Sequence, residues 1–60
     1  MVRRNYVKVE LEEFANFAKG YVEVHFRGYI LKGDSTTPKR AEDIARRLAR
    51  SLDIKFEKTE

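Results

Sequence analysis

The chain has 60 residues, no cysteine and a formal net charge of +3, and 38% of its residues are charged. A chain of this length is expected to form one small domain, spanning residues 1–60, that buries only about 60% of its unfolded surface. The lack of cysteine excludes disulfides and thiolate metal sites and favours a cytoplasmic protein. No apolar run approaches the roughly 18 residues of a membrane span, so no membrane partner is expected.

Two segments of the first half alternate between apolar and polar residues, which is typical of half-buried strands. One covers residues 5–11 and the other residues 21–26, and the second has the more regular pattern. Alternation turns one set of side chains toward a core and the other set toward solvent. The inward set is predicted to be Val7, Val9, Leu11, Val22, Val24 and Phe26.

The connection between these strands has two interpretations. Apolar residues recur at helical spacing over residues 11–19, and Gly20 would then cap a short helix. Alternatively, the first strand continues past a bulge near Glu12 and Glu13, and a long hairpin turns at Lys19 and Gly20. Two helical turns without an N-cap are weak, so the hairpin is slightly favoured.

A second hairpin follows. Arg27 and Gly28 are predicted to form a tight turn in which the glycine accepts a positive φ. Residues 29–32 then form a third strand that returns antiparallel, with Ile30 expected to point into the core.

The second half contains an amphipathic helix from Pro38 to Leu52, with Thr37 as its N-cap. Residues 53–57 alternate again and predict a short extra edge strand. The fold class is therefore α+β, with a three-stranded antiparallel sheet and one C-terminal helix on one face. The stripe expected to face the sheet consists of Ala41, Ile44, Ala45, Leu48, Ala49 and Leu52.

The residues for catalysis are scarce. His25 is the only histidine, and no serine has the flanking glycines of a nucleophile elbow, so no enzymatic activity is expected. The acidic run of Glu10, Glu12 and Glu13 is interpreted as a surface patch. No metal or cofactor is predicted.

The face of the sheet opposite the helix is predicted to carry aromatic side chains among cations. Aromatic rings stack on bases and cations contact phosphates, so this face suits nucleic acid. Exposed tyrosines on an uncovered sheet suit a dimer interface equally well. The side chains expected there are Tyr6, Lys8, Tyr21, His25 and either Tyr29 or Lys32, with Arg27 at the hairpin tip.

The start of the helix offers a second place for phosphate. Lys39 and Arg40 lie near the free amides of the helix N-terminus, beside hydroxyl groups that can donate hydrogen bonds. Together, the candidate nucleic-acid contacts are Arg27, Lys32, Lys39, Arg40, Tyr21, His25 and Tyr29.

The run from Gly33 to Ala49, GDSTTPKRAEDIARRLA, resembles the last strand and second helix of a double-stranded-RNA-binding domain. The resemblance covers under half of the chain. It implies phosphate contacts by Lys39 with Arg40 adjacent, and it implies that the alanines and Leu48 pack on the sheet. The order of strands and helix also resembles the AP2-like domains and the arm-type DNA-binding domains of integrases, which lay a three-stranded sheet in the major groove.

These observations predict a small nucleic-acid-binding domain, for RNA or DNA, whose affinity comes mainly from phosphate contacts. The alternative prediction is a protein-interaction or self-assembling module that uses the uncovered face of the sheet, as a homodimer or with another protein.

Overall fold

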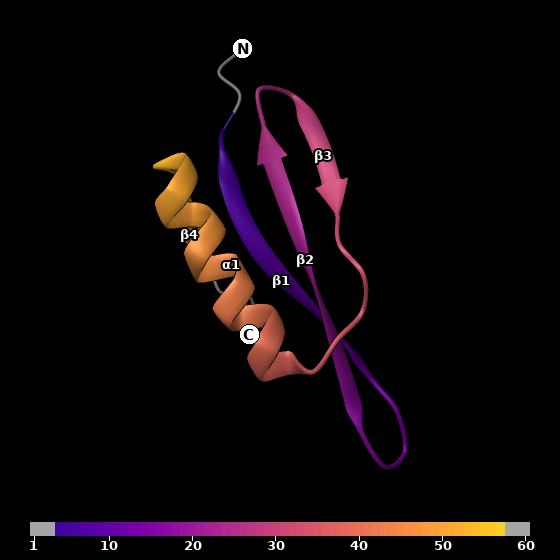
Figure 1. Cartoon of the computed structure of the whole chain (residues 1–60). Helices are drawn as coiled ribbons and strands as arrows, with labels where there is room; N and C mark the ends of the chain where they lie inside the picture. The colour runs from indigo at the N-terminus through magenta and orange to yellow at the C-terminus, as the bar shows by residue number, and fades with distance from the viewer. Residues whose placement is uncertain (1–3, 58–60) are drawn as a thin grey trace.

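The computed structural model describes residues 4–57 and shows a four-stranded sheet with one helix on one of its faces (Figure 1). The predicted α+β class is confirmed, and the strand after the helix takes a place at the edge of the sheet. The strand order is β3-β2-β1-β4, with β4 parallel to β1 and the other pairs antiparallel. In chain order the elements are β1 (Tyr6–Glu13), β2 (Ala18–Phe26), β3 (Tyr29–Lys32), α1 (Pro38–Leu52) and β4 (Lys55–Glu57).

Residues 11–19 belong to the hairpin and not to a helix. Pairing of β1 with β2 runs without interruption to Glu13, which lies opposite Ala18, so the predicted bulge is wrong. The turn lies at residues 14–17 and not at Lys19 and Gly20. It is closed by the Phe14 N–H, which donates to the Phe17 carbonyl at 2.8 Å, and by the stacked rings of the same two residues, 4.8 Å apart.

Gly20 lies inside β2 because the start of the helix comes close to the strand there. A Cβ atom at this position would lie 3.2 Å from the Cβ of Ala41 and 3.2 Å from the Cα of Pro38. Gly20 and Thr36 also exchange both backbone hydrogen bonds, each at 2.7 Å. The glycine therefore lets α1 and the loop before it approach the sheet.

The turn between β2 and β3 fixes which side chains of β3 face the helix. Arg27 and Gly28 both have positive φ, 51° and 85°, as in the tight turns that match strand twist. Tyr29 then lies opposite Phe26, and Ile30 opposite His25. Because residues opposite each other share a face, Tyr29 lies on the helix side and Ile30 on the outer side. The prediction that Ile30 belongs to the core is wrong, and its side chain is 57% exposed.

The helix begins and ends where the sequence predicts. The Thr37 hydroxyl oxygen accepts from the Arg40 N–H at 3.3 Å, which satisfies one free donor of the first turn. Asp53 takes a left-handed conformation after the last turn, and the Ile54 N–H donates to the Ala49 carbonyl at 2.9 Å. These bonds redirect the chain into β4.

The core is built from small side chains. Alanines of α1 pack on valines of β1 and β2, so the helix lies close to the sheet and its larger side chains overhang the flank. Ile44 and Leu52, predicted to be core residues, are 41% and 39% exposed for this reason, and Leu11 is 50% exposed on β1. The buried apolar residues are Val7, Val9, Val22, Val24, Ala41, Ala45 and Ala49.

We expect Gly20→Ala to lower the free energy of unfolding by about 1 kcal/mol, because the new methyl group overpacks a contact bounded by backbone and Cβ atoms. Urea unfolding measures this change. The matched control is Gly33→Ala, whose added Cβ would meet only the Val22 carbonyl oxygen at 3.6 Å. Equal stability of the two variants would contradict the close approach at Gly20.

Candidate functional site

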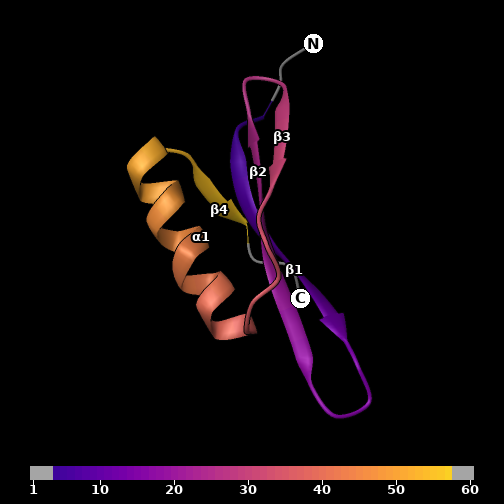
Figure 2. The ribbon, with the colours of Figure 1, turned by 45° about the vertical axis from the view of Figure 1, so that its right-hand side comes forward.

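The helix covers only part of its face of the sheet. Contacts of α1 are with β1, β2 and β4, and none are with β3. Figure 2 shows α1 standing on one side of the sheet, with β4 between the end of the helix and the strands. The helix-side surface of β3 is therefore open, whereas Val22 and Val24 of β2 are buried.

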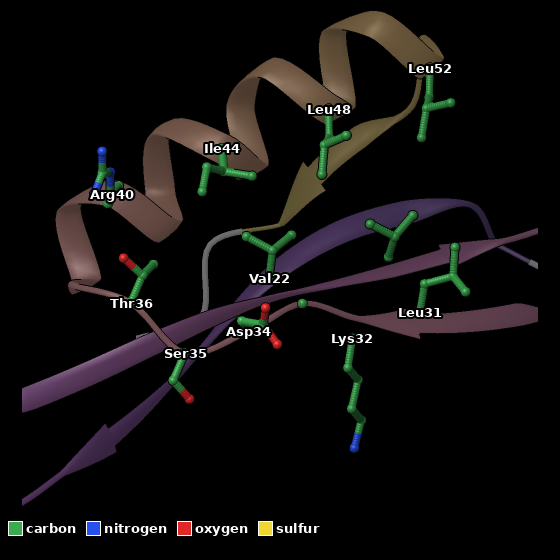
Figure 3. A pocket seen from close by; sticks show the side chains of 12 residues that line it. Val22, Leu31, Lys32, Asp34, Ser35, Thr36, Arg40, Ile44, Leu48 and Leu52 are labelled. Atoms are coloured by element: carbon green, nitrogen blue, oxygen red, sulfur yellow. The ribbon is translucent and has the colours of Figure 1, made fainter.

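A groove of about 550 Å³ lies between α1 and this open strip (Figure 3). Side chains of α1 point down into it, and side chains of β2 and β3 point up from its floor. A hollow of about 390 Å³ continues it toward the β2–β3 turn and adds Phe26 and Tyr29. The apolar side chains of the groove itself are Val22, Val24, Leu31, Ile44, Leu48 and Leu52.

The groove is an exposed apolar surface on a very small protein. Tyr29 is 74% exposed and Leu31 is 63% exposed. Leu31 lines the groove together with Ile44, which is 41% exposed, and Tyr29 lines the adjoining hollow together with Leu52 of α1. Large contiguous apolar patches are uncommon on monomers and mark binding sites. Leu31 and the apolar side chains of the helix wall do not appear among the predicted site residues, because the sequence pattern assigns Ile44 and Leu52 to the core.

Cations line the rim of the groove. Arg40 and Arg47 lie beside Ile44 on α1, and Asp43 lies next to them. Within residues 4–57 neither arginine side chain forms an ion pair. Arg27 borders the far end of the groove. The rim is therefore mainly basic, although Asp34 in the loop after β3 contributes one carboxylate.

The outer face of the sheet has a different character. Glu23 projects there yet is only 7% exposed, because the side chains around it close over it. Its Oε1 accepts from His25 Nε2 at 2.6 Å and lies 3.6 Å from the Lys8 ammonium. Lys8 also pairs with Glu10 at 2.7 Å, and the Tyr6 ring stacks on His25 with centroids 4.3 Å apart. Lys8, Glu10, Glu23 and His25 thus form one network of polar contacts on this face.

This network shifts the pKa values of two of its members. The hydrogen bond from His25 lowers the pKa of Glu23, and the charges of Lys8 and Lys32 act in the same direction against the opposing effect of burial. The hydrogen bond to Glu10 raises the pKa of Lys8. Sequence reasoning missed Glu23 because its importance follows from register, which sets it directly opposite Lys8.

The predicted nucleic-acid contacts do not form one surface. Tyr21, His25 and Lys32 belong to the outer face, and Lys32 points away from the helix in Figure 3. Tyr29, which was one of two candidates for the outer face, lies on the helix side. The structure brings Arg27 and Tyr29 together at the hollow near the turn, whereas Arg40 borders the groove and Lys39 is exposed on the helix.

Two further observations bear on function. The part of the chain that the structure describes contains no cluster of three or more histidine, aspartate and glutamate side chains able to hold a metal ion. Its helix is too short and too polar to cross a bilayer. Comparison of the chain with protein-family models, with curated proteins and with solved structures found no match.

The Glu23 network predicts a specific dependence of stability on acid. Because the pKa of Glu23 is lowered in the folded state, its contribution is present above the unfolded carboxyl pKa of about 4.3 and is lost as the pH falls through the lower folded value. We therefore expect Glu23→Gln to flatten the acid limb of a plot of unfolding free energy against pH.

Urea unfolding at a series of pH values from about 6 down to 2 measures this effect. Glu13→Gln, at the exposed end of β1, is the matched control and should keep the wild-type profile. If Glu23→Gln and the wild type lost the same stability across this range, the network would not stabilise the fold.

Proposed function

We propose that this protein is a protein-interaction module whose groove between α1 and β3 binds an amphipathic helix of another protein. The observation that carries the proposal is the open apolar groove itself, with Leu31 and Ile44 exposed on its two sides. In helix-in-groove recognition, apolar residues at spacings of three and four enter such a cleft. The proposed surface is thus on the helix side of the sheet and not on the outer face.

The open surface beside α1 is shared between β3 and the flank of the helix. Four strands at about 4.8 Å spacing give a sheet roughly 19 Å across, and a helix with its side chains is about 10 Å across. One helix therefore covers about half of the sheet, and α1 lies over β1 and β2 with fewer contacts to β4. A second helix would lie over β3, where it would rest on Leu31 and against Ile44 on the flank of α1.

The charges at the rim indicate the chemistry of that helix. Arg40 and Arg47 are seven residues apart, so they lie about 10.5 Å apart along the axis of α1, two turns from each other. A helix lying alongside α1 would meet both if it carried carboxylates at the same spacing on its flank. The preferred partner is therefore a helix with a leucine-rich or isoleucine-rich stripe bordered by acidic residues.

The α1 helix of a second copy does not fit this description. Its apolar stripe is already used on its own sheet, and the opposite side of the helix is strongly charged. Inserting that side would bury charged side chains against an apolar floor that offers them no hydrogen-bond partner. The side chains concerned are Lys39, Asp43, Arg46 and Arg50.

Nucleic-acid binding is a second candidate, and the same charged side of α1 favours it. Lys39 and Arg50 are exposed, and neither they nor Arg40 and Arg47 form ion pairs with another described residue. Such a row of cations provides phosphate contacts without base readout. Of the predicted contacts, Lys39 and Arg40 belong to this charged side of α1, whereas Tyr21 and His25 lie on the sheet outside it.

The groove is tested with a synthetic amphipathic peptide of about 18 residues, long enough to hold a helix, with leucines on one stripe and glutamates along its flanks. We expect saturable binding by titration calorimetry. Ile44→Gln should weaken binding by about tenfold or more, because it removes a large apolar contact. Ile30→Gln makes the same change on the outer face and should leave binding unchanged.

Reversal of charge tests the role of the rim. The double variant Arg40→Glu and Arg47→Glu should lose affinity for the glutamate-flanked peptide and gain affinity for the same peptide with lysine flanks. Equal binding of both peptides by both proteins would mean that the rim does not select the partner, and failure of every such peptide to bind would contradict the helix-in-groove proposal.

The second candidate predicts that the double variant Lys39→Glu and Arg50→Glu, which leaves the groove intact, binds nucleic acid more weakly and with a smaller dependence on salt. Each lost phosphate contact should reduce the slope of log affinity against log salt by about 0.9 for duplex DNA. Fluorescence anisotropy with duplex RNA, duplex DNA and single strands measures this. Affinity that is independent of salt would exclude phosphate contacts as its source.

A further inference from the structure

The backbone of β3 has a free edge. Among residues 4–57, β3 is the first strand in the sheet order and pairs only with β2, where Leu31 lies opposite Val24 and Tyr29 opposite Phe26. The Gly33 N–H donates to the Val22 carbonyl at 2.8 Å. Because hydrogen-bonded positions alternate along an antiparallel strand, Leu31 and Tyr29 also direct their backbone N–H and C=O groups toward β2. The N–H and C=O groups of Ile30 and Lys32 therefore point outward from the sheet.

This edge lacks most of the features that prevent strands from pairing with other chains. The opposite edge, β4, has three residues and carries Lys55 and the ion pair of Glu57 with Arg4. β3 presents instead three consecutive exposed apolar or aromatic residues, from Tyr29 to Leu31, and a single charge at Lys32. Exposed apolar edges of this kind are templates for the addition of another strand.

We propose that two copies of this chain associate by antiparallel pairing of their β3 strands about a two-fold axis at Leu31. This inference concerns the edge of the sheet and does not depend on the groove. In a symmetric antiparallel pairing, one residue lies opposite the same residue of the other copy. In the segment that carries the outward N–H and C=O groups, this central residue is Ile30, Leu31 or Lys32. The three centres differ in what they place opposite Lys32.

Centring on Lys32 would set two lysines directly opposite each other, which is unfavourable. Centring on Ile30 would place Lys32 opposite Gly28, which belongs to the turn and has a φ of 85°. Centring on Leu31 sets Ile30 of each copy opposite Lys32 of the other, so that each pair exchanges both backbone hydrogen bonds. Only this register pairs both outward-directed residues of β3, Ile30 and Lys32, within the strand and keeps the two lysines from lying opposite each other.

The same register brings the two Leu31 side chains together on the helix side. They form the non-hydrogen-bonded pair at the axis, where Cα atoms lie about 4.5 Å apart and side chains are closest. The result is a continuous sheet through both copies, with the two helices on the same face and the two grooves adjoining. Because one four-residue strand makes a small interface, the dimer should dissociate on dilution.

The register is tested by cross-linking, which the absence of native cysteine makes unambiguous. In Leu31→Cys the two thiols would lie within the Cα separation of about 4.4–6.8 Å that a disulfide spans, so mild oxidation should give a covalent dimer. In Ile30→Cys the two thiols are offset by two residues along the strands and should not join. Cross-linking of Ile30→Cys in preference to Leu31→Cys would overturn the register.

Association itself is tested by sedimentation of the unmodified chain over a concentration series, where we expect a shift from monomer to dimer mass. Ile30→Pro removes an outward N–H without removing a bond to β2, so it should abolish the dimer. Its circular dichroism should match that of the wild type, which would show that the fold is retained. A monomer at all concentrations, or a dimer unaffected by Ile30→Pro with folding retained, would overturn the proposal.

Discussion

The close contact between the alanine face of α1 and the first two strands determines the rest of the architecture. Ala41 and Ala45 are fully buried, and Gly20 leaves space for the helix to start against β2. Small side chains allow a short distance between helix and sheet, and that distance fixes the helix over β1 and β2. Because the helix is held there, its larger residues project over the flank and β3 remains uncovered.

The two faces of the sheet consequently differ: polar side chains of the outer face have partners within the protein, whereas apolar side chains of the helix side remain exposed to water. On the outer face Glu23 is enclosed by His25 and Lys8, and buried polar groups with partners make a surface that gains little from a ligand. On the helix side Leu31 and Ile44 remain in contact with water. Removal of this apolar area from water would be the dominant favourable term in the binding that we propose for the groove.

Local signals in the sequence predicted the ends of α1, the third strand and the two-residue turn, because Thr37, Pro38 and Gly28 act within a few residues. The prediction of which β3 side chains face the helix was wrong, although the two-residue turn determines it. Because Tyr29 lies opposite Phe26, which faces the helix, Tyr29 must face the helix too and Ile30 must face outward. The place of the first hairpin turn required knowledge of the helix contact at Gly20, which is distant in sequence. The groove could not be predicted, because helical periodicity marks Ile44 as apolar but does not say where the sheet ends.

The groove and the free edge of β3 are two separate consequences of one half-covered sheet. The largest fully buried side chain is that of Val7, so the chain by itself removes little large apolar surface from water. A helix above β3 would supply apolar contacts, whereas a strand beside β3 would supply hydrogen bonds to Ile30 and Lys32 in the plane of the sheet. Both proposed associations would involve Leu31, whose side chain lines the groove and would meet its counterpart at the two-fold axis. Each of them would add burial that the fold lacks.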